Sequence, residues 1–112
     1  MRVTKIFSFD SAHQLHGHSG KCANLHGHTY RLEVTVEGPV NGEGMVVDFY
    51  DLKQIVEERV IRKLDHTFIN DIIPVSTAEN IVQWVWAELV PYLRLSQLRL
   101  WETPSCYVTL QG

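Results

Sequence analysis

The residues of this sequence that best fit chemistry at a metal ion are three histidines, His13, His26 and His28. His26 and His28 alternate in a segment that is predicted to be a strand, so their imidazoles point to the same face. His13 ends the apolar segment before it. Three imidazoles leave one position of a tetrahedral ion open, as in catalytic zinc sites, and we predict Zn²⁺ here. Because only neutral imidazole binds a metal, binding should weaken below about pH 6.

Cys22 precedes this pair, and its spacing leaves three roles open: zinc ligand, catalytic base or bystander. His16 and His18 repeat the alternate spacing in a Gly- and Ser-rich segment, where we expect both to be exposed to solvent. Cys106 falls in an alternating apolar segment and is predicted to be a small buried residue. We expect no disulfide between the two cysteines, because a reducing compartment keeps them as thiols.

Two further positions carry titratable side chains in a context that suits catalysis or binding. His66, with Asp65 before it, is either a general acid or base or half of a charged pair at a helix C-terminus, where the dipole favours a cation. Glu102 shares the parity of Leu98 and Leu100 on a predicted strand, where an unpaired carboxylate is costly. It either lies already in the following turn or anchors a ligand by accepting two parallel N–H bonds from a guanidine-like edge.

Length and composition are those of a small globular domain, which we expect to span residues 1–112. Hydrophobic residues make up 45% of the chain and charged residues 21%. The formal net charge is −3 and the sequence has no basic run, so nucleic acid and anionic membranes are not expected as partners. No apolar segment has the length of a signal peptide core or a membrane span, and we expect a cytoplasmic protein.

Hydrophobic periodicity predicts the strands that must position these residues. The predicted strands are 2–13, 26–37, 97–102 and 105–111. In the second strand the apolar residues share the parity of His26 and His28. Both imidazoles are therefore expected on the buried face, where they need partners such as a metal.

Two helices are predicted between the second and third strands. A short strand is expected at 45–47, and Asp48 then has the position of an N-cap for a helix that ends near residue 64. Ser76 and Glu79 form a capping-box pattern that predicts Ser76 as the N-cap of the second helix. The order ββααββ predicts an α+β fold, a four-stranded antiparallel sheet with both helices on one face. The uncovered face points to subunit association.

Motifs spread over the whole chain resemble those of the 6-pyruvoyltetrahydropterin synthase family. They are Phe9-Asp10-Ser11-Ala12-His13, Cys22-x-x-x-His26-Gly27-His28, Val47-Asp48-Phe49, Leu64-Asp65-His66, Ser76-Thr77-Ala78-Glu79-Asn80 and Trp101-Glu102-Thr103. A variant of the family has Glu in place of the cysteine. The presence of Cys22, with no Glu between it and His26, favours the queuosine-type or the biopterin-type reaction.

The resemblance implies the tunnelling fold (T-fold), in which trimers close a barrel and two trimers stack into a homohexamer with sites at subunit interfaces. It also implies roles for single residues. The implied metal ligands to Zn²⁺ are His13, His26 and His28. The implied catalytic residues are Cys22 as proton acceptor, His66 with Asp65 in proton relay, and Glu102; the implied substrate-binding residues are Glu102 as pterin anchor, Thr77 and Thr103. Lys21, next to Cys22, is a candidate to bind the triphosphate.

The implied substrate is 7,8-dihydroneopterin triphosphate. In the queuosine-type reaction it becomes 6-carboxy-5,6,7,8-tetrahydropterin, with release of acetaldehyde and triphosphate. Two alternatives stay open: a 6-pyruvoyltetrahydropterin synthase, which stops after triphosphate elimination, and a non-catalytic pterin- or metal-binding module. Detection of acetaldehyde distinguishes the two synthases.

Overall fold

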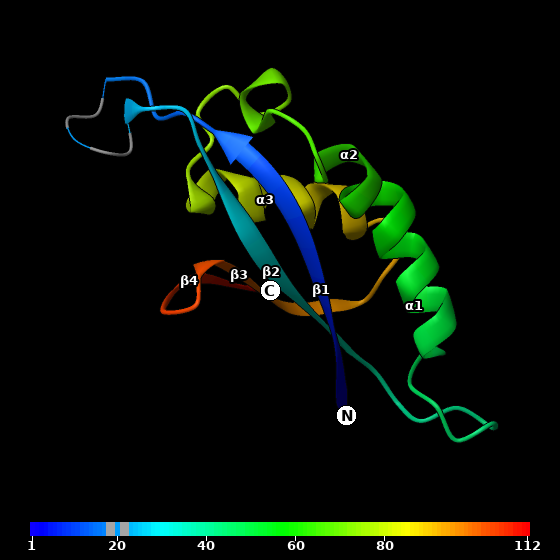
Figure 1. Ribbon diagram of the computed structural model, residues 1–112. Helices are drawn as coiled ribbons and strands as arrows, with labels where there is room; N and C mark the ends of the chain where they lie inside the picture. Colours follow the sequence, from blue (N-terminus) through cyan, green and yellow to red (C-terminus); the bar gives the residue numbers. More distant parts are fainter. Residues whose placement is uncertain (18–19, 21–22) are drawn as a thin grey trace.

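The computed structural model describes residues 1–17, 20 and 23–112, and in this part of the chain four strands form one antiparallel sheet. The strands follow the spatial order β1-β2-β3-β4, and their bounds are Arg2–His13 (β1), His26–Glu37 (β2), Leu95–Thr103 (β3) and Cys106–Gln111 (β4). Figure 1 shows α3 crossing behind β1 and β2, with α1 and α2 beside it. The predicted α+β order ββααββ is confirmed.

Alternation decides which face of the sheet is buried. The buried apolar side chains on the helix-covered face are Phe7 and Phe9 of β1, Tyr30, Leu32, Val34 and Val36 of β2, and Leu98 and Leu100 of β3. The residues between them are mostly exposed or partly exposed and polar. Because His26 and His28 share the parity of the buried set, their imidazoles lie on the helix-covered side, as predicted.

The first helix contains a wider turn in its middle. Helix α1 (Phe49–Val56) continues through a π-helical segment, η2 (Glu57–Ile61), into the short α2 (Arg62–Leu64). The predicted N-cap is confirmed, because Asp48 Oδ1 accepts the Tyr50 N–H at 2.8 Å. The strand predicted at 45–47 is wrong: this apolar segment has no strand partner among the described residues. It is held by a local turn, in which Asn41 N–H donates to the Met45 carbonyl at 2.8 Å.

Helix α3 (Ala78–Leu89) begins one residue later than the capping-box pattern predicts. Thr77, not Ser76, is the N-cap, and its Oγ1 accepts the Asn80 N–H at 3.2 Å. The Ser76 hydroxyl is buried and donates instead to Asn70 Oδ1 at 3.0 Å, beside the short 3₁₀ helix η3 (Ile69–Asp71). Ser76 is therefore taken into a buried hydrogen-bond network and is no longer available as a cap.

The prediction that Cys106 is buried is also wrong. Cys106 is exposed, because it pairs with Thr103 directly after the hairpin turn, at the end of the edge strand β4. Within the described residues, no helix has the length and hydrophobicity that crossing a membrane would require.

Candidate active site

The paired strands β1 and β2 bring the three predicted metal ligands together. His13 and His26 are direct partners in the β1–β2 register, and His28 lies two residues further along β2. One ring nitrogen from each histidine lies within 4.8 Å of the other two. His13 is fully buried, and the other two rings are partly buried. This cluster is a candidate metal-binding site.

Backbone carbonyl groups fix the proton positions on two of these rings. His13 Nδ1 lies 2.8 Å from the Ser76 carbonyl oxygen, and His26 Nδ1 lies 2.7 Å from that of Asn24. A carbonyl only accepts hydrogen bonds, so each Nδ1 carries a proton and donates it. The two Nε2 atoms face each other across 2.9 Å, and with Nδ1 protonated on each ring the neutral form of both rings directs a lone pair from each Nε2 at the other. A cation that accepts both lone pairs removes this repulsion, so the donor set fits a divalent metal.

The third ring also has a nitrogen without a partner. His28 Nε2 is buried and makes no hydrogen bond to the described residues, although Glu102 Oε1 lies 3.2 Å away, outside hydrogen-bond alignment. Burial lowers the pKa of His28; the Glu102 carboxylate opposes this effect, and the two neighbouring histidines reinforce it. The balance favours the neutral ring, which is the form that binds a metal.

Tyr30 packs beside the histidine cluster, and the spacing of residues in the sequence alone does not reveal its contacts. Its fully buried ring lies with its centroid 5.4 Å from that of His28 and stacks on Phe9 at 5.0 Å. Its hydroxyl has no hydrogen-bond partner in the described part of the chain. Burial, followed by the Glu102 carboxylate, raises the pKa of Tyr30. The signal for its position is the parity that it shares with His28.

Asp65 and His66 follow α2 and are in direct contact, which adjacency in sequence does not guarantee. His66 Nδ1 lies 3.0 Å from Asp65 Oδ2, and the His66 side chain is 79% exposed. The φ of His66 is 55°, a backbone conformation that residues other than glycine rarely adopt. This strained turn is tied to β1, because His66 N–H donates to the Asp10 carbonyl at 2.6 Å.

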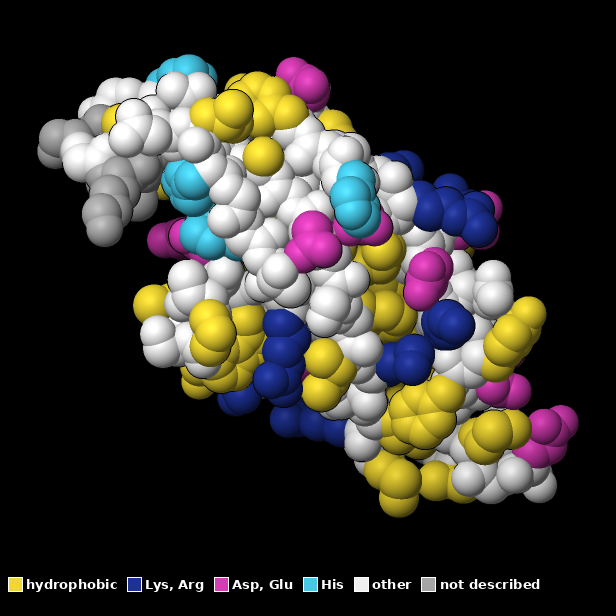
Figure 2. All heavy atoms as spheres, viewed as in Figure 1, with side chains coloured by type: hydrophobic (Ala, Val, Ile, Leu, Met, Phe, Trp, Pro, Cys, Tyr) yellow, Lys and Arg dark blue, Asp and Glu magenta, His cyan; other side chains and the backbone are white. Residues whose placement is uncertain are grey.

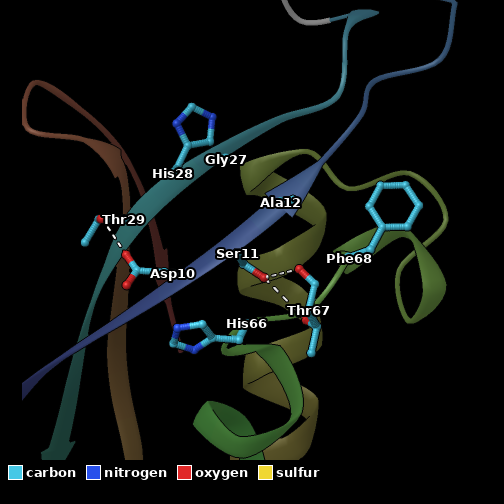
Figure 3. A pocket seen from close by; sticks show the side chains of 9 residues that line it. All are labelled: Asp10, Ser11, Ala12, Gly27, His28, Thr29, His66, Thr67 and Phe68. Atoms are coloured by element: carbon cyan, nitrogen blue, oxygen red, sulfur yellow. Dashed lines mark hydrogen bonds between the residues drawn. The ribbon is translucent and has the colours of Figure 1, made fainter.

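Asp10 completes a second group of titratable side chains at this edge of the sheet. One ligand atom from each of Asp10, Asp65 and His66 lies within 4.8 Å of the other two. Asp10 N–H donates to Asp65 Oδ1 at 2.9 Å, and this bond is the largest cause of the lowered pKa of Asp65, with smaller contributions from His66. Asp10 Oδ1 accepts the Thr29 hydroxyl at 2.5 Å (Figure 3). No pattern within β1 predicts these contacts, because they depend on the path of the loop after α2.

Two hollows share residues 27–29 of β2 as part of their lining. The first hollow has a volume of about 610 Å³ and extends to His66 (Figure 3). The second hollow has a volume of about 530 Å³ and extends to Glu102. A Cβ placed on Gly27 would come within 4 Å of one atom only, the Ser11 carbonyl oxygen at 3.4 Å, so the missing side chain keeps this shared part open. Both volumes are those of small-molecule sites.

The remaining predicted site residues are not all brought together within one chain. Thr103 lines the second hollow beside Glu102. Thr77 lines a separate hollow of about 190 Å³, together with His16, which is exposed as predicted. Cys22, Lys21 and His18 lie outside the described residues. Figure 2 shows histidine side chains in the upper half of one face, with acidic side chains spread over it and Lys and Arg side chains mainly below the histidines and to the right.

A histidine cluster beside two ligand-sized hollows, with His66 on the wall of one of them, is typical of an enzyme that acts on a small molecule. The family model described as 6-pyruvoyl tetrahydropterin synthase matches residues 2–112, and the chain belongs to this family. The fold agrees with this assignment. The structure of the Caenorhabditis elegans 6-pyruvoyl tetrahydropterin synthase matches with a TM-score of 0.91 and 28% identity, over 100% of this chain and 95% of that chain. The sheet and helices therefore form a T-fold.

Two curated relatives differ in the activity that they are named for. The chain is 38% identical to the 6-carboxy-5,6,7,8-tetrahydropterin synthase of Haemophilus influenzae, over 98% of each chain and 138 aligned positions. It is 40% identical to the dihydroneopterin monophosphate aldolase of Pyrococcus furiosus, over 98% of this chain, 96% of that protein and 114 aligned positions. This chain has 112 residues, so an alignment of 138 positions must contain many gaps in it, whereas an alignment of 114 positions needs few.

Proposed function

We propose that this protein is a lyase of the 6-carboxy-5,6,7,8-tetrahydropterin synthase type. It converts 7,8-dihydroneopterin triphosphate to 6-carboxy-5,6,7,8-tetrahydropterin, the queuosine-type product, and releases acetaldehyde and triphosphate. The observation that carries the proposal is the end-to-end similarity to the Haemophilus influenzae synthase. The assignment to a family of pterin-processing lyases and the histidine cluster beside open hollows support it.

His13, His26 and His28 would hold a Zn²⁺ ion in this proposal. Support comes from the two Nδ1 atoms that face carbonyl oxygens and from the buried, unpartnered Nε2 of His28. When bound, the ion would supply Lewis acidity to the hydroxyl oxygens of the substrate side chain and acidify the adjacent C–H group. The other steps fall to protein side chains.

Cys22 and His66 are the proposed proton-transfer groups. Cys22 takes the role of the base that removes the carbon-bound proton, on the strength of the family motif alone. Asp65 holds His66 through Nδ1, which leaves Nε2 as the atom that gives or takes a proton. The exposed ring lines the first hollow and reaches both solvent and a bound ligand.

Glu102 is the proposed anchor of the pterin ring. Its side chain is 28% exposed in the second hollow, where its carboxylate can accept the 2-amino and N3 protons of a pterin as two parallel bonds. Thr103 would contact the same ligand. Thr77 lines another hollow in its own chain, so its contribution requires a neighbouring subunit, in keeping with a proposed homohexamer built from two trimers. We place this enzyme in the cytoplasm.

A second candidate function is an aldolase that acts on a phosphorylated dihydroneopterin. The observation that favours it is the nearly gap-free alignment with the Pyrococcus furiosus protein over 114 positions. An aldolase leaves the phosphate on the aldehyde fragment that it releases, whereas the synthase reaction expels triphosphate. The two reactions therefore differ in the fate of the phosphate.

The deciding experiment incubates the zinc-loaded protein with 7,8-dihydroneopterin triphosphate and, separately, the monophosphate, and identifies the products by mass spectrometry. Acetaldehyde with a 6-carboxy pterin supports the proposal, and a phosphorylated aldehyde supports the aldolase. A 6-pyruvoyl pterin without acetaldehyde assigns the biopterin-type reaction. No turnover with metal bound contradicts catalysis and leaves a binding module. Cys22→Ala should abolish turnover and retain zinc, whereas Cys106→Ala, at an exposed thiol, should retain both.

A further inference from the structure

The second hollow occupies the place where β2 and β3 separate. The last paired residues of these strands are Arg31 and Trp101, although β2 continues to His26 and β3 to Thr103. His28 and Glu102 line the hollow where the strands have parted, and Arg31 lines it where they part. One cavity thus connects the candidate metal site with an arginine that no motif singles out.

Arg31 is held in place without using up its hydrogen-bonding capacity. Its guanidinium lies 5.3 Å from the centroid of the Trp101 ring, and one nitrogen lies 3.6 Å from Glu33 Oε2. The same Glu33 oxygen accepts the Trp101 indole N–H, so this carboxylate is shared between two donors. A guanidinium has five N–H donors, and the Arg31 side chain remains 49% exposed. Most of its donors are therefore free to bind a ligand.

The charge of the hollow indicates which ligand group Arg31 would bind. Among the described residues that line it, Arg31 is the only lysine or arginine, and Glu102 is the only carboxylate. A planar guanidinium fork matches the oxygens of a phosphate, and a cation is needed where a multiply charged anion enters a protein hollow. Glu102, in contrast, suits the N–H donors of a ring.

We propose that Arg31 binds a phosphate group on the substrate side chain and sets the preference of the enzyme for phosphorylated over unphosphorylated dihydroneopterin. This inference rests on the proposed function. In this proposal two residues of the hollow bind opposite ends of one substrate. Glu102 accepts hydrogen bonds from the ring, and Arg31 neutralises the phosphate.

The test compares wild-type protein, Arg31→Met and Arg99→Met with 7,8-dihydroneopterin triphosphate as the substrate. Unphosphorylated 7,8-dihydroneopterin, which has no triphosphate to expel, is added as a competitive inhibitor. Arg99, on β3, is the matched control, because its guanidinium also lies beside an aromatic ring, at 5.0 Å from the Tyr107 centroid, but it lines neither hollow. We expect Arg31→Met to raise KM for the triphosphate about 10- to 100-fold, the range for a charge-assisted bond to one phosphate. Ki for the unphosphorylated compound and kcat for the triphosphate should not change, and Arg31→Lys should be intermediate.

An equal effect of Arg31→Met on KM for the triphosphate and on Ki for the unphosphorylated compound, or no effect on either, overturns the proposal. A thermal melt of each variant shows whether it is folded. A calorimetric titration of the metal-loaded proteins with inorganic phosphate gives a readout that does not need turnover. Weaker phosphate binding by Arg31→Met than by Arg99→Met supports the role of Arg31 even if the triphosphate substrate does not react, in which case the proposed function fails separately. Equal phosphate binding by the two variants overturns it.

Discussion

The contact between Asp65 and β1 makes a prediction about stability that can be worked out from the structure. Asp65 accepts the Asp10 N–H at 2.9 Å and holds His66 at 3.0 Å in a turn whose φ is 55°. Asp65→Asn keeps an oxygen for the Asp10 N–H but removes the charge. Asparagine has nearly the shape and volume of aspartate. The loss of stability should therefore reflect the lost charge alone.

The expected loss of stability is small, because the carboxylate is 35% exposed. A hydrogen bond to a charged group contributes about 1.5–3 kcal/mol, against about 1 kcal/mol for a neutral pair. Screening by solvent reduces the difference to about 0.5–1 kcal/mol. For a chain of this length that lowers Tm by about 2–5 °C at pH 7.

The pH dependence gives the sharper test. The folded pKa of Asp65 is lowered, so its stabilisation is fully present above the unfolded value of about 4 and disappears as the pH falls through the folded value. The difference in Tm between wild type and Asp65→Asn should be constant from about pH 7 to 5 and shrink below about pH 4.

The assay is calorimetric melting of metal-free protein at one fixed concentration, so that release of metal from the histidines does not contribute. Asp71→Asn is the control, because Asp71 is exposed and makes no side-chain hydrogen bond in the described part of the chain. It should change Tm little at any pH. A Tm difference for Asp65→Asn that stays constant down to pH 3, or grows in acid, refutes the reasoning.

Three further substitutions test the metal cluster, its support and the floor of the hollows. His13→Ala should weaken zinc binding by more than the roughly 10- to 100-fold that loss of an outer-shell partner costs, measured by competition with a chelator; undiminished affinity would contradict the assignment. Asn70→Ala removes bonds to the Gln14 backbone and the Ser76 hydroxyl and should lower the free energy of unfolding in urea by about 2–3 kcal/mol; a loss below half of that would show that water replaces them. Gly27→Ala should leave Tm nearly unchanged but raise KM about 10-fold, as an added methyl group does in a tight site; an unchanged KM would place the substrate elsewhere.

Alternation is a local signal, and it predicts the first half of the sheet closely. The predicted strands 2–13 and 26–37 coincide with β1 and β2, because apolar and polar residues alternate without interruption in the second strand and a long hairpin imposes one register on both. The same alternation predicts that His26 and His28 face inward. The proximity of His13 follows from the register, in which it is opposite His26.

The features that sequence does not predict depend on contacts between distant segments. Ser76 has the residue type of an N-cap, yet its buried hydroxyl donates a hydrogen bond to Asn70, and Thr77 is the N-cap instead. Cys106 has the pattern of a buried residue, yet its strand lies at an edge of the sheet. The meeting of Asp10 with Asp65 joins positions far apart in the chain. None of these contacts produces a periodic pattern of apolar and polar residues in the sequence from which it could be predicted.

The two halves of β2 perform different physical tasks, and this division accounts for the position of the site. Residues 31–36 pair with strands on both sides, and their inward side chains Leu32, Val34 and Val36 belong to the core. Among the described residues, residues 26–30 pair with β1 alone, so one strand edge and the space beside it are left for the histidine cluster and the hollows. Truncation of Leu32 to alanine should therefore cost about 2–5 kcal/mol of stability, whereas changes at His26 should alter metal binding with a smaller effect on the free energy of unfolding of the metal-free protein. A strand that is paired on both sides along its whole length would hold the same residues but would leave no space for a ligand beside them.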